Sequence, residues 1–95
     1  MEGKLRFRLL TPAGEAYSGP CDYAELTAKD DADGNGGGSL GIRRGHIPAV
    51  AALEEGGRVR VLLEGETVFA ARVRGGFARI DRESVTVLTA EIVEL

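Results

Sequence analysis

The sequence has few of the residues on which metal centres, disulfide-linked proteins and many enzymes depend. Among its 95 residues it contains one cysteine, Cys21, one histidine, His46, and no tryptophan. A single cysteine cannot close a disulfide within the chain, and this indicates a reducing compartment. A Cys/His metal site needs several such ligands, and no second histidine accompanies His46. We therefore expect Cys21 to be a buried structural residue and the chain to have no catalytic residues and no cofactor.

Long apolar runs and a strong positive charge are also absent. No run of 18 apolar residues is present, so no insertion into a membrane is expected. The first four residues lead directly into an alternating segment, without the apolar block of a secretory signal, which favours an intracellular location. The formal net charge of −3 argues against a nucleic-acid partner. Ten of the twelve basic residues are arginine, which suits either a solvated strand face or a protein interface.

What the sequence does contain is a repeated alternation of apolar and polar residues. In residues 4–9, Leu5, Phe7 and Leu9 fall on one face and the basic residues on the other, which predicts a half-buried strand. Turn residues separate further segments of this kind. The predicted strands cover residues 4–9, 15–18, 21–27, 39–42, 58–63, 67–74, 77–81, 84–89 and 91–95, with Gly19 and Pro20 ending the second.

Residues 48–53 are open to two interpretations. Their alanine content and the leading Pro48 favour a helical turn, and a short buried strand is the alternative. With or without this segment, about ten short strands separated by frequent turns predict an all-β fold, a sandwich or a barrel. No linker or internal repeat is visible, so residues 1–95 are expected to form a single domain.

Residues 29–38 are predicted to form a flexible loop rich in glycine and aspartate. Within it, Asp31, Asp33 and Asn35 match the first half of a calcium-binding loop. The second half does not match, because the twelfth position is Ile42 instead of glutamate, and no flanking helices are predicted. These three residues are weak candidates for a cation site, and no metal is assigned. No Lys-Ser or Lys-Thr follows the glycines, which argues against a phosphate-binding loop.

Several short motifs occur in an order that resembles one family. They are Leu9 to Gly14, Gly41-Ile42 followed by Gly45-His46 and Pro48, Gly75-Gly76-Phe77, Val85 to Leu88, and Ala90-Glu91. In this order and spacing they resemble the N-terminal domain of the epsilon subunit of F-type ATP synthases. Each motif alone is common, but the ordered set covers about residues 4–91.

The resemblance implies a fold, partners and a location. It implies two five-stranded sheets packed as a β-sandwich, which favours a strand for residues 48–53. It implies a rotor subunit of a proton- or sodium-translocating synthase, peripheral at the cytoplasmic face of the membrane. Its partners would be the gamma subunit and the polar loops of the membrane ring. Carried onto this chain, the ring-facing segment comprises Ser39, Leu40, Gly41, Ile42, Arg43, Arg44, Gly45, His46 and Pro48.

The chain also departs from the family pattern. Arg44 replaces the usual proline before Gly-His, with Arg43 beside it, and Ser39 stands where many members have a carboxylate. These changes would alter charge complementarity with the ring. The family's C-terminal helical hairpin is missing from this sequence, either naturally or because it was removed, and in the first case neither inhibition nor ATP sensing is expected. A stand-alone β-sandwich binding module with a cation-binding loop remains the alternative function.

Overall fold

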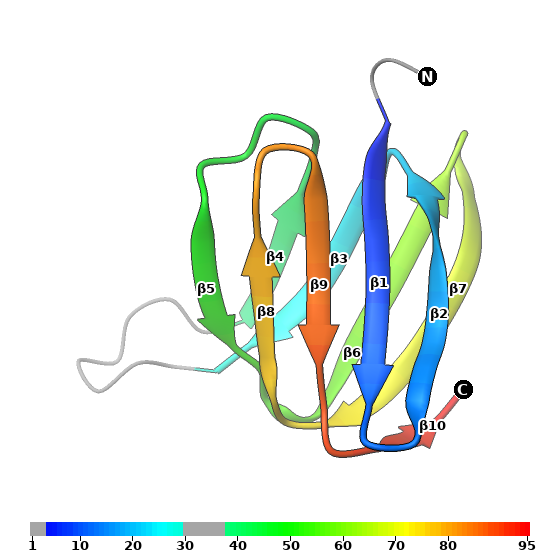
Figure 1. Ribbon diagram of the computed structural model, residues 1–95, viewed down its shortest axis with the longest axis vertical. Helices are drawn as coiled ribbons and strands as arrows, with labels where there is room; N and C mark the ends of the chain where they lie inside the picture. Colours follow the sequence, from blue (N-terminus) through cyan, green and yellow to red (C-terminus); the bar gives the residue numbers. More distant parts are fainter. Residues whose placement is uncertain (1–3, 30–37) are drawn as a thin grey trace.

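The computed structural model describes residues 4–29 and 38–95, and the regular structure of these residues consists of β-strands (Figure 1). In this described part of the chain no helix is long and apolar enough to cross a membrane. The strands are β1 (Leu5–Thr11), β2 (Gly14–Cys21), β3 (Tyr23–Ala28), β4 (Gly38–Ile42), β5 (Ala49–Ala52), β6 (Glu55–Leu63), β7 (Glu66–Arg74), β8 (Phe77–Ile80), β9 (Ser84–Leu88) and β10 (Ile92–Glu94).

The strands form two five-stranded sheets that lie face to face (Figure 1). The first sheet has the order β2-β1-β9-β8-β5, and the second has the order β10-β7-β6-β3-β4. Neighbouring strands are antiparallel except β1 and β9, which run parallel. The predicted all-β sandwich is therefore confirmed, including its two five-stranded sheets.

The core lies between the sheets and is built by the predicted alternation. Leu5, Phe7 and Leu9 of β1 are buried, whereas Arg6 and Arg8 are exposed. Along one side of the sandwich, the ring of Tyr17 stacks on Phe69 with centroids 4.5 Å apart, and it also contacts Phe7. The remaining fully buried large side chains are Leu26, Ile42, Ile80, Val59, Val61, Val73, Val85, Val87 and Cys21.

The boundary between the second and third strands differs from the prediction. Gly19 and Pro20 do not end a strand, because β2 continues to Cys21. β2 is an edge strand, and an edge position tolerates a proline because no neighbouring strand needs its missing N–H. A bend at Asp22 then separates β2 from β3, so residues 21–27 are not one strand. The bend explains why Cys21 and Ala24, three residues apart, are both buried.

The ambiguous segment at residues 48–53 forms a strand, β5, which pairs with β8. The helical interpretation of this segment is therefore wrong. Local alanine content favours a helix only weakly, and pairing with a neighbouring strand overrides it.

Candidate partner interface

The loop of residues 43–48, which is the later part of the predicted docking segment, connects the edge strand β4 of the second sheet to the edge strand β5 of the first. At the upper end of Figure 1 it lies beside the turn between β8 and β9. The Gly45 N–H donates to the Arg82 carbonyl at 2.6 Å, and the His46 N–H donates to the Arg43 carbonyl at 3.2 Å. Gly45 has a φ of 91°, a conformation that glycine adopts without strain. The Gly45–Arg82 bond joins the two loops, and the His46–Arg43 bond closes the first loop on itself. We call residues 43–48 and 82–83 the arginine rim.

The arginine rim carries more positive than negative charge. It contains Arg43, Arg44 and Arg82 but a single acid, Glu83, which pairs with Arg44 at 3.3 Å. The guanidinium carbon of Arg43 lies 4.6 Å from the centroid of the Tyr23 ring, a cation–π contact. The Tyr23 ring in turn lies so close to Gly41 that a Cβ atom there would overlap it. The glycine of the Gly-Ile motif thus makes room for the ring on which Arg43 rests.

His46 and Ile47 lie at the tip of the arginine rim. The His46 Nδ1 atom is 2.7 Å from the Ile47 carbonyl oxygen, so one ring nitrogen contacts neighbouring backbone. The Ile47 side chain is 76% exposed, which is unusual for a large apolar residue. Ile47 lies within the predicted docking segment but was not named as an interface residue, although its position between His46 and Pro48 was a usable signal.

The structure divides the predicted docking segment into two parts. Ser39 and Arg43 lie at opposite ends of β4, roughly 13 Å apart at 3.3 Å per residue. Ile42 is fully buried in the core and Leu40 packs against it, so these two side chains serve the fold. The loop that carries Arg43, Arg44, Gly45, His46 and Pro48 is therefore joined to Arg82 and Glu83 through Gly45 and Arg44, whereas Ser39 lies apart from it.

The weak cation candidates Asp31, Asp33 and Asn35 lie outside the described residues. Within residues 4–29 and 38–95, no three His, Cys, Asp or Glu side chains come together as metal ligands.

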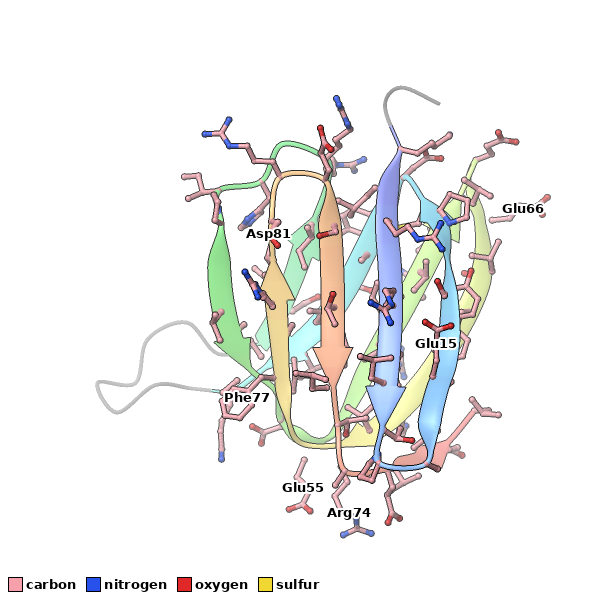
Figure 2. All side chains as sticks on the ribbon, viewed as in Figure 1. Glu15, Glu55, Glu66, Arg74, Phe77 and Asp81 are labelled. Carbon is pink, nitrogen blue, oxygen red and sulfur yellow. The ribbon has the colours of Figure 1, made fainter. Side chains whose placement is uncertain are left out.

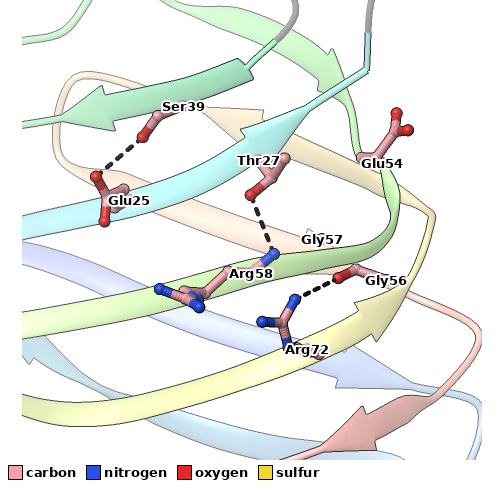
Figure 3. Close-up of a pocket in the computed structure, with 8 residues that line it drawn as sticks. All are labelled: Glu25, Thr27, Ser39, Glu54, Gly56, Gly57, Arg58 and Arg72. Carbon is pink, nitrogen blue, oxygen red and sulfur yellow. Dashed lines mark hydrogen bonds between the residues drawn. The ribbon is translucent and has the colours of Figure 1, made fainter.

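An open groove of about 350 Å³ crosses the outer face of the second sheet (Figure 3). Glu25 accepts a hydrogen bond from the Ser39 hydroxyl at 2.9 Å and pairs with Arg60 at 3.0 Å. These contacts, the hydrogen bond first, hold the pKa of Glu25 below its ordinary value. Arg72 donates to the Gly56 carbonyl at 3.1 Å and pairs with Glu94 at 3.2 Å. Glu25 and Arg72 thus have partners, and the lowered pKa of Glu25 makes its carboxylate a weak base for the adjacent Ser39 hydroxyl.

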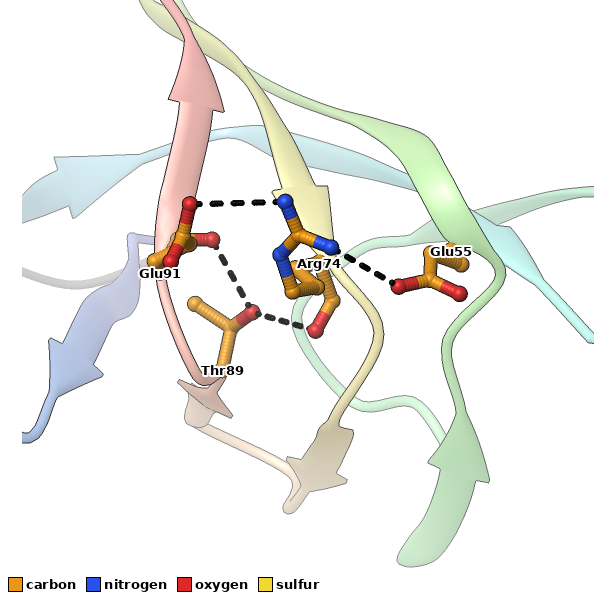
Figure 4. Close-up of polar contacts among 4 residues, drawn as sticks. All are labelled: Glu55, Arg74, Thr89 and Glu91. Atoms are coloured by element: carbon orange, nitrogen blue, oxygen red, sulfur yellow. Dashed lines mark hydrogen bonds and ion pairs between the residues drawn. The ribbon is translucent and has the colours of Figure 1, made fainter.

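Polar contacts tie together the opposite end of the sandwich (Figure 4). Arg74 lies between Glu55 at 3.4 Å and Glu91 at 3.6 Å. The buried Thr89 hydroxyl donates to the carbonyls of Arg74 and Glu91. This end of the molecule uses its polar groups to join β7, β9 and β10, so they serve the fold.

Sequence reasoning missed a row of apolar side chains on the outer face of the first sheet. Phe77 lies directly opposite Ala52 on one side and Leu88 on the other, and Leu88 lies opposite Leu10. Phe77 is 57% exposed and Leu88 is 48% exposed, and Figure 2 shows Phe77 projecting from the sandwich. We call Ala52, Phe77, Leu88 and Leu10 the apolar row. The outward direction of these two side chains was predictable from alternation, because Phe77 precedes Ala78 and Leu88 follows Val87, both of which face the core.

Comparison with known proteins identifies this arrangement of sheets and loops. Residues 4–95 match the family described as ATP synthase, delta/epsilon chain, β-sandwich domain. The chain belongs to this family. The ATP synthase epsilon chain of Frankia casuarinae is 33% identical over 91 residues, which are 96% of both chains. The ATP synthase epsilon chain of Bacillus velezensis is 35% identical and covers 95% of this chain, which spans 65% of that relative. The resemblance to the epsilon subunit is thereby confirmed.

Solved ATP synthase structures share the fold. A chain of the Euglena gracilis mitochondrial ATP synthase, in a structure of OSCP, F1 and c-ring, superposes with a TM-score of 0.80 at 21% identity. The match covers 99% of this chain and 55% of that one. A chain of the Tetrahymena thermophila central stalk and c-ring gives a TM-score of 0.73 at 13% identity, over 96% of this chain and 66% of that one. As a member of the delta/epsilon family, the chain is a non-catalytic part of an ATP synthase and not an enzyme in its own right.

Proposed function

We propose that this chain is a central-stalk subunit of a proton- or sodium-translocating F-type ATP synthase. In this role it couples the membrane ring to the gamma subunit through protein–protein contacts, as a peripheral protein at the cytoplasmic face of the membrane. The observation that carries the proposal is the family match over residues 4–95. The sandwich adds two surfaces suited to partners, the apolar row and the arginine rim.

The apolar row supports contact with the gamma subunit. Its side chains come from four neighbouring strands, β5, β8, β9 and β1, and so form one continuous strip. The strip continues into an open groove lined by Leu10, Pro12 and Leu88. Contiguous exposed apolar surface is uncommon on isolated soluble domains and marks sites of protein association. Burying Phe77 and Leu88 against a partner would contribute favourable free energy through removal of apolar area from water.

The arginine rim supports contact with the polar loops of the membrane ring. Three guanidinium groups on two hydrogen-bonded loops face solvent with one carboxylate among them. Arginine forms bidentate bonds with carboxylates, so the rim suits acidic partner loops. Opposite charge on the two surfaces would speed association and select the partner. The rim therefore supplies charge recognition and the apolar row supplies buried area.

The body between these surfaces suits the transmission of torque. Two sheets enclose a core of fully buried side chains, and close-packed interiors of this kind resist compression and transmit strain. A force applied at the arginine rim is thus carried to the apolar row with little deformation.

Two binding experiments test the proposal. The purified chain is mixed with the gamma subunit of its own organism and analysed by size-exclusion chromatography. Co-migration at micromolar concentration is expected, and persistent separation would favour the stand-alone binding module instead. For the arginine rim, the double variant Arg43→Glu/Arg44→Glu is expected to weaken assembly with the ring. Arg58→Glu/Arg72→Glu makes the same charge change on the outer face of the second sheet and is expected to assemble normally.

A further inference from the structure

The edge strand β5 is suited to accept another strand. It reads Ala49-Val50-Ala51-Ala52 and carries no charge. The other edges have features that discourage strand pairing, such as proline, charged residues, glycine and very short length. β2 contains Pro20 and Glu15, β4 contains two glycines and precedes Arg43, and β10 has three residues including Glu94. In the described part of the chain, β5 is therefore the least protected edge.

The backbone of β5 has hydrogen-bonding groups that point away from β8. The Leu53 N–H donates to the Gly76 carbonyl beside β8, whereas the Ala52 carbonyl accepts from Lys29 on the opposite side, both at 2.9 Å. Because these directions alternate along a strand, the N–H and C=O of Val50 also point away from β8. No backbone bond to Val50 from outside its own sheet occurs among the described residues. The Val50 side chain is 70% exposed, which agrees with an open edge.

We propose that β5 accepts an extended segment of the stalk partner as an additional strand of the first sheet. This inference rests on the proposed function and specifies how the partner is held. The partner segment bonds to the backbone of Val50 and to the N–H of Ala52. It is uncharged and places apolar side chains on the face that carries the apolar row. Added strands of this kind bind through main-chain hydrogen bonds and gain specificity from alternate side chains.

Two features favour an uncharged segment of the stalk partner as the added strand. The residues of β5 offer an added strand alanine and valine and no charged side chain, so a charged segment would lose solvation along β5 without gaining a partner there. Lys29, which lies on this side, bonds to Ala52 through its backbone N–H. Val50 and Ala52 lie on the outer face, and Ala52 is also the first residue of the apolar row. A partner body that covers the row can therefore place a strand against β5 in the same contact. The edge and the face thus form one continuous binding surface.

A proline substitution tests the backbone bond directly. Val50→Pro removes an N–H that points away from β8, so the pairing of β5 with β8 remains intact. Val50→Ala is the matched control, because it shortens the side chain and keeps the N–H. Binding of the gamma subunit is measured by isothermal titration calorimetry. Loss of the bond from the Val50 N–H is expected to weaken binding about 10-fold in the proline variant relative to the alanine variant. Equal affinities of the two variants would overturn the proposal.

Hydrogen–deuterium exchange resolved by NMR provides a measurement on the unaltered chain. In the free chain the Ala51 amide, which points toward β8, is expected to exchange slowly and the Val50 amide quickly. Binding of gamma is expected to slow exchange at Val50 and Ala52. If wild-type gamma binds without this protection, strand addition is wrong and the proposed function stands. If wild-type gamma does not bind, the proposed function itself fails. A self-associated chain that protects Val50 without gamma would show that the occupant is a second copy, contrary to the proposal.

Discussion

Phe77 and Leu88 lie directly opposite each other on β8 and β9, and both side chains point away from the core. Because both side chains are about half exposed and face each other across the strands, replacing both with serine is expected to cost about 1–2 kcal/mol of unfolding free energy. The same double variant is expected to weaken binding to the gamma subunit by about 10-fold or more, since buried aromatic anchors dominate interface energies. Urea denaturation and calorimetric titration measure the two effects.

Val68→Ser is the matched control for this pair. Val68 is also a large apolar residue at 42% exposure, but it lies on β7 of the second sheet. Its replacement is expected to leave gamma binding unchanged. Equal losses of affinity from the two sheets would contradict the assignment of the interface to the apolar row.

Gly76 is required by space as well as by conformation. Its φ is 111°, and a Cβ atom there would overlap the Leu88 carbonyl and lie 2.9 Å from the Thr89 Cα. Gly14 has a similar φ of 127° but open space around it. Gly14→Ala is therefore expected to cost about 1–3 kcal/mol of unfolding free energy from backbone strain alone. Gly76→Ala is expected to cost clearly more in urea denaturation, and equal costs would refute the steric requirement.

Cys21 is expected to be unreactive in the native protein. The side chain is fully buried, and burial raises the pKa of its thiol to about 11. At pH 8 the reactive thiolate is thus about 100-fold scarcer than for an ordinary thiol, and shielding slows attack further. Labelling with iodoacetamide, followed by mass spectrometry, is expected to be at least about 100-fold slower in the native state than in urea. Rapid native labelling would show that the end of β2 opens readily.

The Lys4–Asp22 contact makes stability sensitive to acid. The Asp22 carboxylate accepts bonds from the Lys4 ammonium and the Glu64 N–H, both at 2.6 Å. These bonds, that from Lys4 first, hold the pKa of Asp22 below its ordinary value of 3.8. Because the folded pKa lies below the unfolded one, the contribution is complete above pH 3.8 and is lost as the pH falls through the folded pKa.

Asp22→Asn removes the charge that titrates in this window. The variant is expected to be less stable than wild type at pH 7, and the difference is expected to shrink toward pH 2. The pKa of Glu25 is also lowered, but Glu25 is present in both proteins, so its effect on the pH dependence of stability is the same in each. Urea midpoints across pH 2–7 measure the effect, and parallel pH profiles of the two proteins would contradict it.

Much of the architecture was predictable because strands leave a local pattern. Side chains alternate between the two faces of a strand, so the burial of Leu5, Phe7 and Leu9 follows from their spacing. Turn chemistry is local as well, and the turn between β6 and β7 has positive φ at Glu64 and Gly65, as a two-residue type I′ hairpin requires. The order of the glycine motifs indicated the family, and the family resemblance in turn favoured a strand at residues 49–52.

The tertiary structure decided what depends on neighbours distant in sequence. Sequence order did not reveal that β2 lies at an edge, where Pro20 is tolerated, or that Asp22 lies beside Lys4. It placed Ser39 and His46 in one docking segment, whereas β4 separates the ends of that segment. It also left Phe77 and Leu88 as separate outward positions, and only strand pairing joined them into a surface. Alternation is a property of a single strand, whereas edges, registers and surfaces are properties of pairs of strands, and pairing is settled by long-range packing.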